Sequence, residues 1–387
     1  MSVTAAAGFV AAGVHAGIRR ERKDLALVRT LGAGTGAAMW TQNRVQAAPV
    51  VVSKRHLERA QPQAVVVNSG VANAATGAQG EADARATAEH AAALLGLEPE
   101  QVVVLSTGVI GAPLPLDRVL AGLDAAVPAL SEDGGDDAAE AILTTDTKSK
   151  TSVSRGPGFA VGGMAKGSGM IHPVLATMLA VVTTDYPLEP GEPLDVLRPA
   201  VDESFNAISV DGECSTNDAV VLLSSGAAAV DRTPASDEAF ALALQTVCKD
   251  LAAQIVADGE GATLVAEIEV SGAASAPEAR AIAQRIATSP LVKTALFGRD
   301  ANWGRILAAA GSAPFDGGYA EVDPARVSLS YNGTAVLLAG TPQHVEPPVD
   351  GGVCTIALDL GLGSGSASYL TSDLSYDYVR INADYRT

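Results

Sequence analysis

The sequence has few residues of the kinds that mark several protein classes. Aromatic residues make up 4% of the chain although apolar residues make up 48%, so the core must be built mainly from Ala, Val, Leu and Ile. The cysteines lie too far apart for a CxxC pair or a zinc-ligand pattern, and we expect reduced, mostly buried thiols. They are Cys214, Cys248 and Cys354.

Long apolar runs and positive charge are also scarce. No stretch approaches the ~20 apolar residues of a membrane span, and the N-terminus lacks the basic start of a signal peptide, so we expect a cytoplasmic protein. With 26 basic against 44 acidic residues, the chain carries a formal charge of -18. This charge disfavours nucleic acid and anionic membranes as partners. An anionic small substrate would need a local basic pocket.

Familiar catalytic motifs are missing as well. The sequence contains no GxxxxGK[ST], no HExxH and no GxSxG, which argues against a P-loop enzyme, a zincin and an elbow-type hydrolase. The five histidines are scattered, so a His-based triad has little support. We predict no metal site.

What the chain does contain is alternating strand and helix patterns. Residues 64–67 predict a buried strand, residues 81–95 an Ala-rich helix closed by Gly96, and residues 102–105 a second strand. Short links between these elements favour helices layered on a sheet, that is, a mixed α/β fold. The second strand ends in Ser106-Thr-Gly108, where a strand-based active site would place polar groups.

Further elements follow along the chain. Ser236 is expected to cap a helix, and Asn332-Gly333 predicts a tight hairpin turn between strands at 327–331 and 334–338. Residues 132–137 are expected to be a linker. The apolar stripe of the Ser236 helix comprises Phe240, Leu244, Val247, Leu251 and Ile255.

The most unusual segment is residues 162–173, where glycines surround Lys166 and an apolar run interrupted by Thr177 follows. Glycine allows strained backbone angles and close approach of another group. Self-cleavage needs such strain, because a hydroxyl must be held against the preceding carbonyl, here that of Ala176. Cleavage would free the α-amine of Thr177, whose pKa near ~8 lets it deprotonate the Thr177 hydroxyl. From spacing alone, however, a structural threonine remains the more common interpretation.

The same segments resemble the ornithine acetyltransferase family over almost the whole chain. Lys166-Gly-Ser-Gly-Met-Ile-His-Pro-Val-Leu-Ala-Thr-Met-Leu179 is similar to the cleavage segment of that family. The resemblance implies self-cleavage before the threonine and ping-pong acetyl transfer from N2-acetylornithine to glutamate without a cofactor. Comparable family segments match Asn43 to Pro49, Asn68 to Gly77, Ser106 to Gly111, Thr144 to Thr147, Ser215 to Asp218, Asp258 to Thr263, Asn302 to Arg305 and Tyr378 to Thr387.

The resemblance also implies roles for single residues. Thr177 would carry the acetyl group, while the Thr107 hydroxyl and the Gly108 N–H would form the oxyanion hole. A buried cation such as Lys166 would suit the α-carboxylate of both substrates, and Glu260 could pair with the ornithine amine. The positions that match substrate contacts of the family are Thr144, Lys166, Thr177, Glu260, Asn382 and Thr387.

For the architecture, the family implies helix, sheet, sheet and helix layers in a main domain, with a smaller C-terminal domain. Cleavage would give an α subunit of residues 1–176 and a β subunit of residues 177–387, which associate as a heterotetramer of two α and two β chains.

Several alternatives stay open. An N-terminal-nucleophile amidohydrolase or aminopeptidase would share the self-cleavage but pass the acyl group to water. A related ornithine acetyltransferase of secondary metabolism would use another acyl acceptor, and a binding protein would have kept only the fold. A bifunctional enzyme would also accept acetyl-CoA as a second donor.

Overall fold

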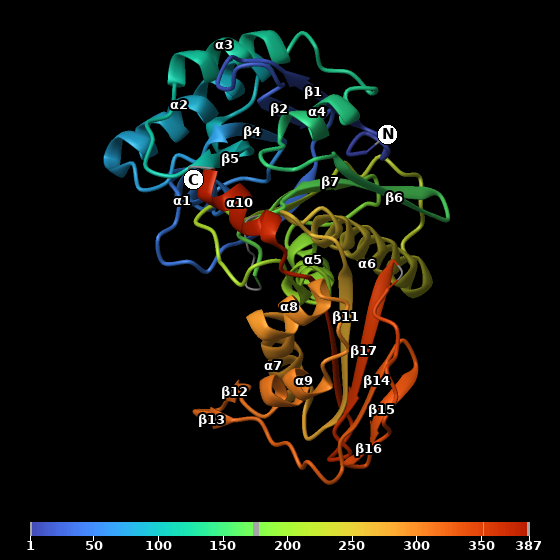
Figure 1. The fold of residues 1–387 in the computed structure, drawn as a ribbon. Coiled ribbons are helices and arrows are strands. Elements are labelled where there is room, and N and C mark those ends of the chain that lie inside the picture. The colour runs from blue at the N-terminus through green and yellow to red at the C-terminus, as the bar shows by residue number, and fades with distance from the viewer. Residues whose placement is uncertain (1, 173–177, 351, 385–387) are drawn as a thin grey trace. The chain divides into compact units, whose positions relative to one another are not determined.

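The computed structural model describes residues 2–172, 178–350 and 352–384 (Figure 1). The chain forms two compact units. Of the described residues, the first unit comprises those within 2–206 and 213–255, and the second comprises those within 207–212 and 256–384.

The first unit contains two sheets. A four-stranded sheet has the order β1-β2-β4-β5, and a five-stranded sheet has the order β3-β10-β8-β7-β6. In the second sheet β8 and β10 run parallel, whereas β7 is antiparallel to both β6 and β8. The strands are β1 (Phe9–Val14), β2 (Leu25–Thr30), β3 (Thr35–Trp40), β4 (Ala64–Val71), β5 (Val102–Val109), β6 (Lys150–Gly156), β7 (Phe159–Lys166), β8 (Leu179–Thr184) and β10 (Ala219–Ser224).

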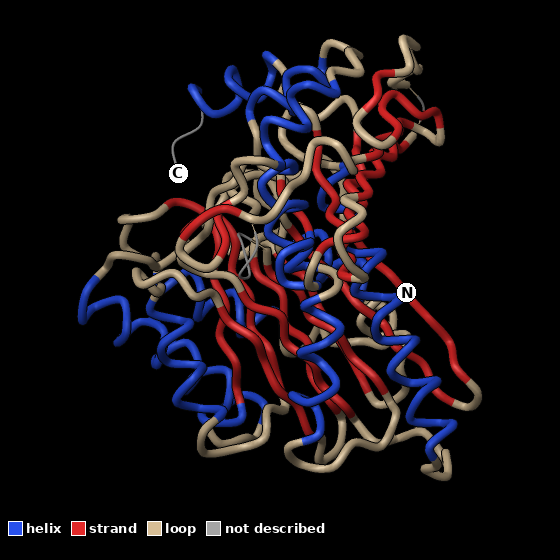
Figure 2. Tube along the Cα trace, turned by 90° about the horizontal axis from the view of Figure 1, so that it is seen from below, coloured by secondary structure: helices blue, strands red, loops and turns tan. Residues whose placement is uncertain are grey.

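Helices α2 and α3 cover the outer face of the four-stranded sheet and α6 lies on that of the five-stranded sheet, while the inner faces pack on each other together with α4 (Figure 2). Alternate residues of β4 show why: Val65 and Val67 face the second sheet, while Ala64 and Val66 face α2 and α3. The predicted helix, sheet, sheet and helix layers are therefore confirmed. The helices are α1 (Ala48–Leu57), α2 (Gly77–Leu95), α3 (Leu116–Ala126), α4 (Gly135–Ala141), α5 (Glu192–Asp202) and α6 (Pro234–Ala257), with short 3-10 turns η1 (Pro99–Gln101) and η2 (Phe205–Ala207).

Helix α6 is long and apolar enough to cross a membrane by length and composition, yet half of its apolar window is buried inside the structure. Its Val247 and Leu251 lie over Gly163 of β7, where a Cβ atom would be 2.9 Å from Leu251 Cδ1 and 3.0 Å from Val247 Cγ1. This is the behaviour of a core helix, and the predicted apolar stripe is buried. The cap was predicted one turn too late. Thr233 caps α6, because its hydroxyl accepts from Ser236 N at 3.2 Å.

The second unit is built on a seven-stranded sheet with the order β16-β15-β14-β17-β11-β18-β9. Helices α7, α8 and α9 pack on it through one apolar cluster. The elements are β9 (Ile208–Ser209), β11 (Val265–Ala273), α7 (Ala276–Ala287), α8 (Pro290–Phe297), α9 (Trp303–Ala310), β14 (Ser328–Tyr331), β15 (Thr334–Leu338), β16 (Thr341–Pro342), β17 (Val353–Asp359), β18 (Gly365–Ser372) and α10 (Tyr376–Asp384), with a separate two-stranded pair, β12 (Pro314–Phe315) and β13 (Gly318–Tyr319).

Most local predictions are confirmed. Gly96 ends α2 with a φ of 68°, and Asn332 and Gly333 form the hairpin turn with φ values of 49° and 77°. The cysteines are free thiols, two of them buried. The linker predicted at residues 132–137 is wrong, because α4 begins at Gly135 and lies on the four-stranded sheet.

Candidate active site

The ends of three neighbouring strands meet at one edge of the five-stranded sheet. Lys166, the last residue of β7, is the register partner of Leu179, the first residue of β8. Leu179 is in turn the partner of Ala219, the first residue of β10. The chain therefore leaves the sheet after Lys166 and returns at Leu179 on the same edge. The predicted cleavage point between Ala176 and Thr177 belongs to this connection and lies outside the described residues.

The four-stranded sheet contributes the end of β5 to the same region. Thr107 is only 5% exposed, and Gly108 adopts a φ of 129°. A Cβ atom on Gly108 would lie 2.3 Å from the carbonyl carbon of Gly70 on β4, so only glycine fits there. The sequence placed these residues just after a strand, but β5 continues to Val109 and the register of its pairing with β4 shifts at Gly70. They lie inside an irregular strand end.

Asn217 connects the two sheets at this edge. Its side-chain amide donates hydrogen bonds to the carbonyl oxygen of Ser106 at 2.8 Å and to that of Ala72 at 2.7 Å. The carbonyl of Ser106 belongs to the peptide unit that leads into Thr107. Because Asn217 lies two residues before β10, this contact holds the irregular end of β5 beside the start of β10.

A buried group of charged residues surrounds Asp146. Lys150 Nζ donates to Asp146 Oδ1 at 2.6 Å, and Lys166 Nζ lies 3.9 Å from Oδ2. Backbone N–H groups complete the set, from Gly167 to Oδ1 at 2.7 Å and from Thr144 to Oδ2 at 2.9 Å. Asp146, Lys150 and Lys166 are each at most 2% exposed. Burial alone would raise the pKa of Asp146, but the charges of Lys166 and Lys150 hold it well below its usual range.

Asp218 has the opposite electrostatic environment. It is 1% exposed, and its Oδ1 accepts a hydrogen bond from Met178 N at 3.0 Å. Burial raises the pKa of Asp218 well above its usual range, although the Met178 N–H and the charge of Lys166 oppose this change. Two carboxyl groups that both interact with Lys166 are therefore driven toward different protonation states. Such separation is typical of active sites.

In the second unit, Glu260 and Asn382 lie together. The side-chain amide of Asn382 on α10 donates to Glu260 Oε2 at 2.8 Å. Nearby, Ser375 Oγ donates to the carbonyl oxygen of Gly261 at 2.6 Å, so the start of α10 and the loop after α6 are joined at two points. Thr387 lies outside the described residues.

The loop that carries Glu260 is also held by a buried carboxylate. Asp373, 3% exposed, accepts hydrogen bonds from Thr263 N at 2.8 Å, Thr263 Oγ1 at 2.5 Å and Leu264 N at 3.1 Å. Lys293 of α8 donates to Thr371 Oγ1 at 2.9 Å and to the carbonyl oxygen of Ser372. These contacts fix the corner from which α10 begins.

A family model described as the ArgJ family matches residues 10–387. The chain belongs to this family. A protein of Symbiobacterium thermophilum is 48% identical over 400 residues, covering 100% of this chain and 98% of the relative, and one of Thermobifida fusca is 47% identical over 392 residues, covering 100% of each. Both relatives are called arginine biosynthesis bifunctional protein ArgJ.

Solved structures of this family match parts of the chain. The arginine biosynthesis bifunctional protein ArgJ of Bacillus halodurans is 39% identical and covers 52% of this chain and 97% of its own, with a TM-score of 0.49. The ornithine acetyltransferase of Mycobacterium tuberculosis complexed with ornithine is 43% identical and covers 44% of this chain and 94% of its own, with a TM-score of 0.41.

Sequence reasoning missed Asp146, Lys150, Asn217 and Asp218 as members of the site. Asp146, Asn217 and Asp218 lie inside segments that matched the ArgJ family, but no local pattern shows which partners they contact. Lys150 carried no signal at all, because it is the first residue of an ordinary strand. Asp146 meets Lys166 and Gly167 only when strands of the five-stranded sheet pair, and Asn217 meets Ser106 only when the two sheets pack.

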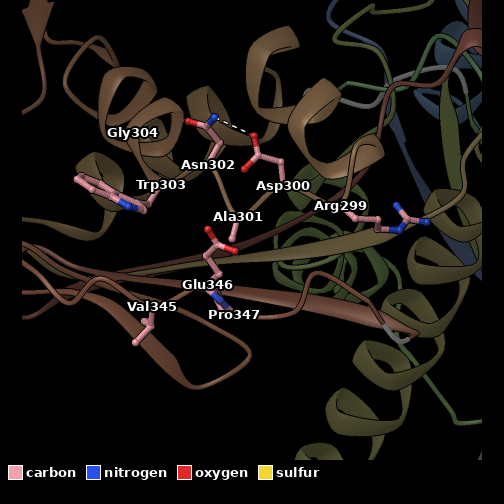
Figure 3. A pocket seen from close by; sticks show the side chains of 9 residues that line it. All are labelled: Arg299, Asp300, Ala301, Asn302, Trp303, Gly304, Val345, Glu346 and Pro347. Carbon is pink, nitrogen blue, oxygen red and sulfur yellow. Dashed lines mark hydrogen bonds between the residues drawn. The ribbon is translucent and has the colours of Figure 1, made fainter.

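A separate cavity of about 650 Å³ lies in the second unit (Figure 3). Asp300, Asn302, Trp303 and Glu346 line it, and the Asn302 amide donates to Asp300 Oδ2 at 2.9 Å. Arg299 also belongs to its lining, but its guanidinium donates to the carbonyl oxygens of Leu296 and Thr263. Among the described residues, none of those predicted to contact substrate lines this cavity.

Proposed function

We propose that the chain cuts itself between Ala176 and Thr177 and then transfers an acetyl group from N2-acetylornithine to glutamate, with Thr177 as the nucleophile. The observation that supports this most strongly is the sheet edge where the chain leaves after Lys166 and returns at Leu179. Lys166, Asp146 and the irregular end of β5 all belong to the same unit, and the fourteen residues from Lys166 to Leu179 resemble the cleavage segment of the family.

The proposed chemistry needs a base and an oxyanion hole. After cleavage, the free α-amine of Thr177 accepts the proton of the Thr177 hydroxyl, which attacks the acetyl carbonyl. The Thr107 hydroxyl and the Gly108 N–H donate to the oxygen that becomes negative. The amide C–N bond then breaks, and the protonated α-amine of Thr177 returns its proton to the departing amine of ornithine. The amine of glutamate attacks the acetyl-threonine ester, its proton passes through the α-amine to the Thr177 oxygen as the ester C–O bond breaks, and acetylglutamate and free Thr177 result.

Recognition of both substrates requires groups of opposite charge. We assign the α-carboxylate to Lys166 and Thr144, and the side-chain amine of ornithine to Glu260. Asn382 orients Glu260 through its hydrogen bond, and Thr387 completes the set of substrate contacts carried over from the family. The relatives' name, arginine biosynthesis bifunctional protein, supports arginine biosynthesis as the pathway.

For the assembled enzyme we propose an α subunit of residues 1–176 and a β subunit of residues 177–387. Two of each form a heterotetramer in the cytoplasm. The proposed reaction needs neither a metal nor a nucleotide cofactor.

Incubation of the purified protein with N2-acetylornithine and glutamate tests this function. We expect acetylglutamate and free ornithine in equal amounts, and mass spectrometry should find chains that end at Ala176 and begin at Thr177. The Thr177→Ala variant should be neither cut nor active. Absence of acetylglutamate from cut wild-type protein would contradict the proposal.

The same assay separates the alternatives. A hydrolase would release acetate at the same rate with and without glutamate, whereas an acetyltransferase needs the acceptor. Replacing N2-acetylornithine by acetyl-CoA tests for the second donor, and a panel of other amino acid acceptors tests for an enzyme of secondary metabolism.

A further inference from the structure

Asp146 connects residues that the proposed function assigns to substrate binding. Its Oδ2 accepts from Thr144 N at 2.9 Å and lies 3.9 Å from Lys166 Nζ. Its Oδ1 accepts from Gly167 N at 2.7 Å, so the same carboxylate also fixes the backbone directly after Lys166. Thr144 precedes β6 and Lys166 ends β7, so neither residue determines the position of the other through the local chain.

We infer that Asp146 is a positioning residue that holds Lys166 and Thr144 in place to receive the carboxylate of a substrate. The inference rests on the proposed function, because it assumes that these two residues contact the substrate. A lysine side chain is long and flexible, and ordering it costs free energy on binding. An anion that already holds the ammonium group removes part of that cost before the substrate arrives.

Lys150 determines how much charge remains for the substrate. It is fully buried and donates to Asp146 Oδ1 at 2.6 Å. In this trio one carboxylate faces two side-chain amines, so the charge of Asp146 is shared between Lys150 and Lys166. Without Lys150, Asp146 would neutralise Lys166 and weaken its attraction for a carboxylate. The low pKa of Asp146 agrees with an ionised carboxylate at neutral pH.

The decisive variant is Asp146→Asn. Asparagine keeps the volume and one acceptor oxygen, so it can still accept from Gly167 N, but its amide nitrogen cannot hold an ammonium group. We expect KM for N2-acetylornithine and for glutamate to rise about tenfold, as is typical when a charged hydrogen-bonding partner is lost. The rate of acylation by 4-nitrophenyl acetate, which has no carboxylate, should change little. If the role of Asp146 were purely structural, the variant would impair the reactions with N2-acetylornithine and with 4-nitrophenyl acetate alike.

Asp185 offers a matched control. It is a buried carboxylate at the opposite end of the same strands, and it accepts from Ala7 N at 3.0 Å and from Ala160 N at 2.8 Å. Asp185→Asn should lower the thermal midpoint of unfolding, but it should change the reactions with N2-acetylornithine and with 4-nitrophenyl acetate by the same factor. Lys150→Met is a second test variant. It should raise KM for N2-acetylornithine and glutamate, although residue 150 is not proposed to contact either substrate.

Calorimetric titration of the cut proteins with ornithine and glutamate tests the same inference without turnover. If the wild type binds them but makes no acetylglutamate, the proposed transfer fails while the inference is still tested by weaker binding to Asp146→Asn. The inference would be overturned if Asp146→Asn changed the reactions with both acetyl donors equally or bound ornithine and glutamate as tightly as the wild type. It would also be overturned if the wild type bound neither ornithine nor glutamate. So would Asp146→Asn and Lys150→Met both remaining unfolded or uncut when Asp185→Asn folds and is cut.

Discussion

The surrounding backbone requires a glycine at position 108. Its φ of 129° lies in the region that favours glycine, and Gly70 on the neighbouring strand has a φ of 109°. The two strands approach so closely that a Cβ atom on Gly108 would lie 2.5 Å from the carbonyl oxygen of Gly70. The shape of the strand end therefore depends on both glycines.

Gly108→Ala should displace this strand end. Backbone atoms cannot move aside as a flexible side chain can, so we expect a free energy of unfolding lower by about 1–3 kcal/mol and a large loss of kcat. Gly111 is a matched control, because it also has a positive φ, of 79°, but a Cβ there would meet no atom within 4 Å. Urea unfolding and steady-state kinetics of both variants provide the measurement. Equal loss of kcat in both would show that the close approach is irrelevant.

Lys293 links stability to pH. Burial lowers its pKa from 10.5 to about 8, although the charges of Asp211 and Asp373 oppose this change. Below pH 8 Lys293 is charged in both the folded and the unfolded protein, so the free-energy cost of burying its charge lowers the stability by its full amount. As the pH rises from 8 to 10.5, the unfolded chain binds more protons than the folded one, so this residue's contribution to stability rises by about 3 kcal/mol at most.

The comparison with Lys293→Met isolates this effect. The difference in free energy of unfolding between the wild type and Lys293→Met, measured in urea at pH 8 and at pH 10, should shift in favour of the wild type at the higher pH. A difference that is independent of pH would mean that Lys293 keeps an ordinary pKa in the folded protein.

At the scale of elements, sequence patterns predicted regular structure well and irregular ends poorly. Helix α2 and the β14–β15 hairpin were predicted because a left-handed glycine or an Asn-Gly pair marks their boundaries locally. The end of β5 was placed outside the strand because its irregular pairing is imposed by β4, which is distant in sequence. Asp146 and Asp218 escaped notice for the same reason. Family resemblance supplied the predicted site residues, but not their partners.

Helix α10 and the loop after α6 depend on Asp373. Asp373→Asn can still accept from Thr263 N and Leu264 N through its amide oxygen, but it loses the negative charge that strengthens these bonds and can no longer accept from the Thr263 hydroxyl, so we expect a free energy of unfolding lower by about 1–3 kcal/mol. KM for N2-acetylornithine should rise, because the loop carries Glu260. Asp359→Asn in the same unit is the control: Asp359 is exposed and accepts from Gly361 N at 3.1 Å, so a change below about 0.5 kcal/mol is expected. An equally mild Asp373→Asn would contradict the assignment.

For the whole molecule, the proposed cut does not follow the boundary between the compact units. The first unit contains residues from both proposed subunits, since β7 precedes Thr177 and β8 and β10 follow it. In the five-stranded sheet, β7 pairs with β8 and β3 pairs with β10, so β8 and β10 of one product lie between β3 and β7 of the other. Each product would leave the other with unpaired strands and exposed apolar faces.

Because the two products share this sheet, cleavage changes the molecularity of unfolding. A single uncut chain unfolds by itself, whereas the cut protein must release two chains, so its midpoint should rise with protein concentration by mass action. We expect thermal midpoints of the cut wild type to depend on concentration more steeply than those of uncut Thr177→Ala. Equal dependence would mean that the products unfold without separating. Cleavage would thus turn folding into an assembly reaction, and a cut enzyme that has been diluted and denatured would recover slowly, because its two chains must first meet.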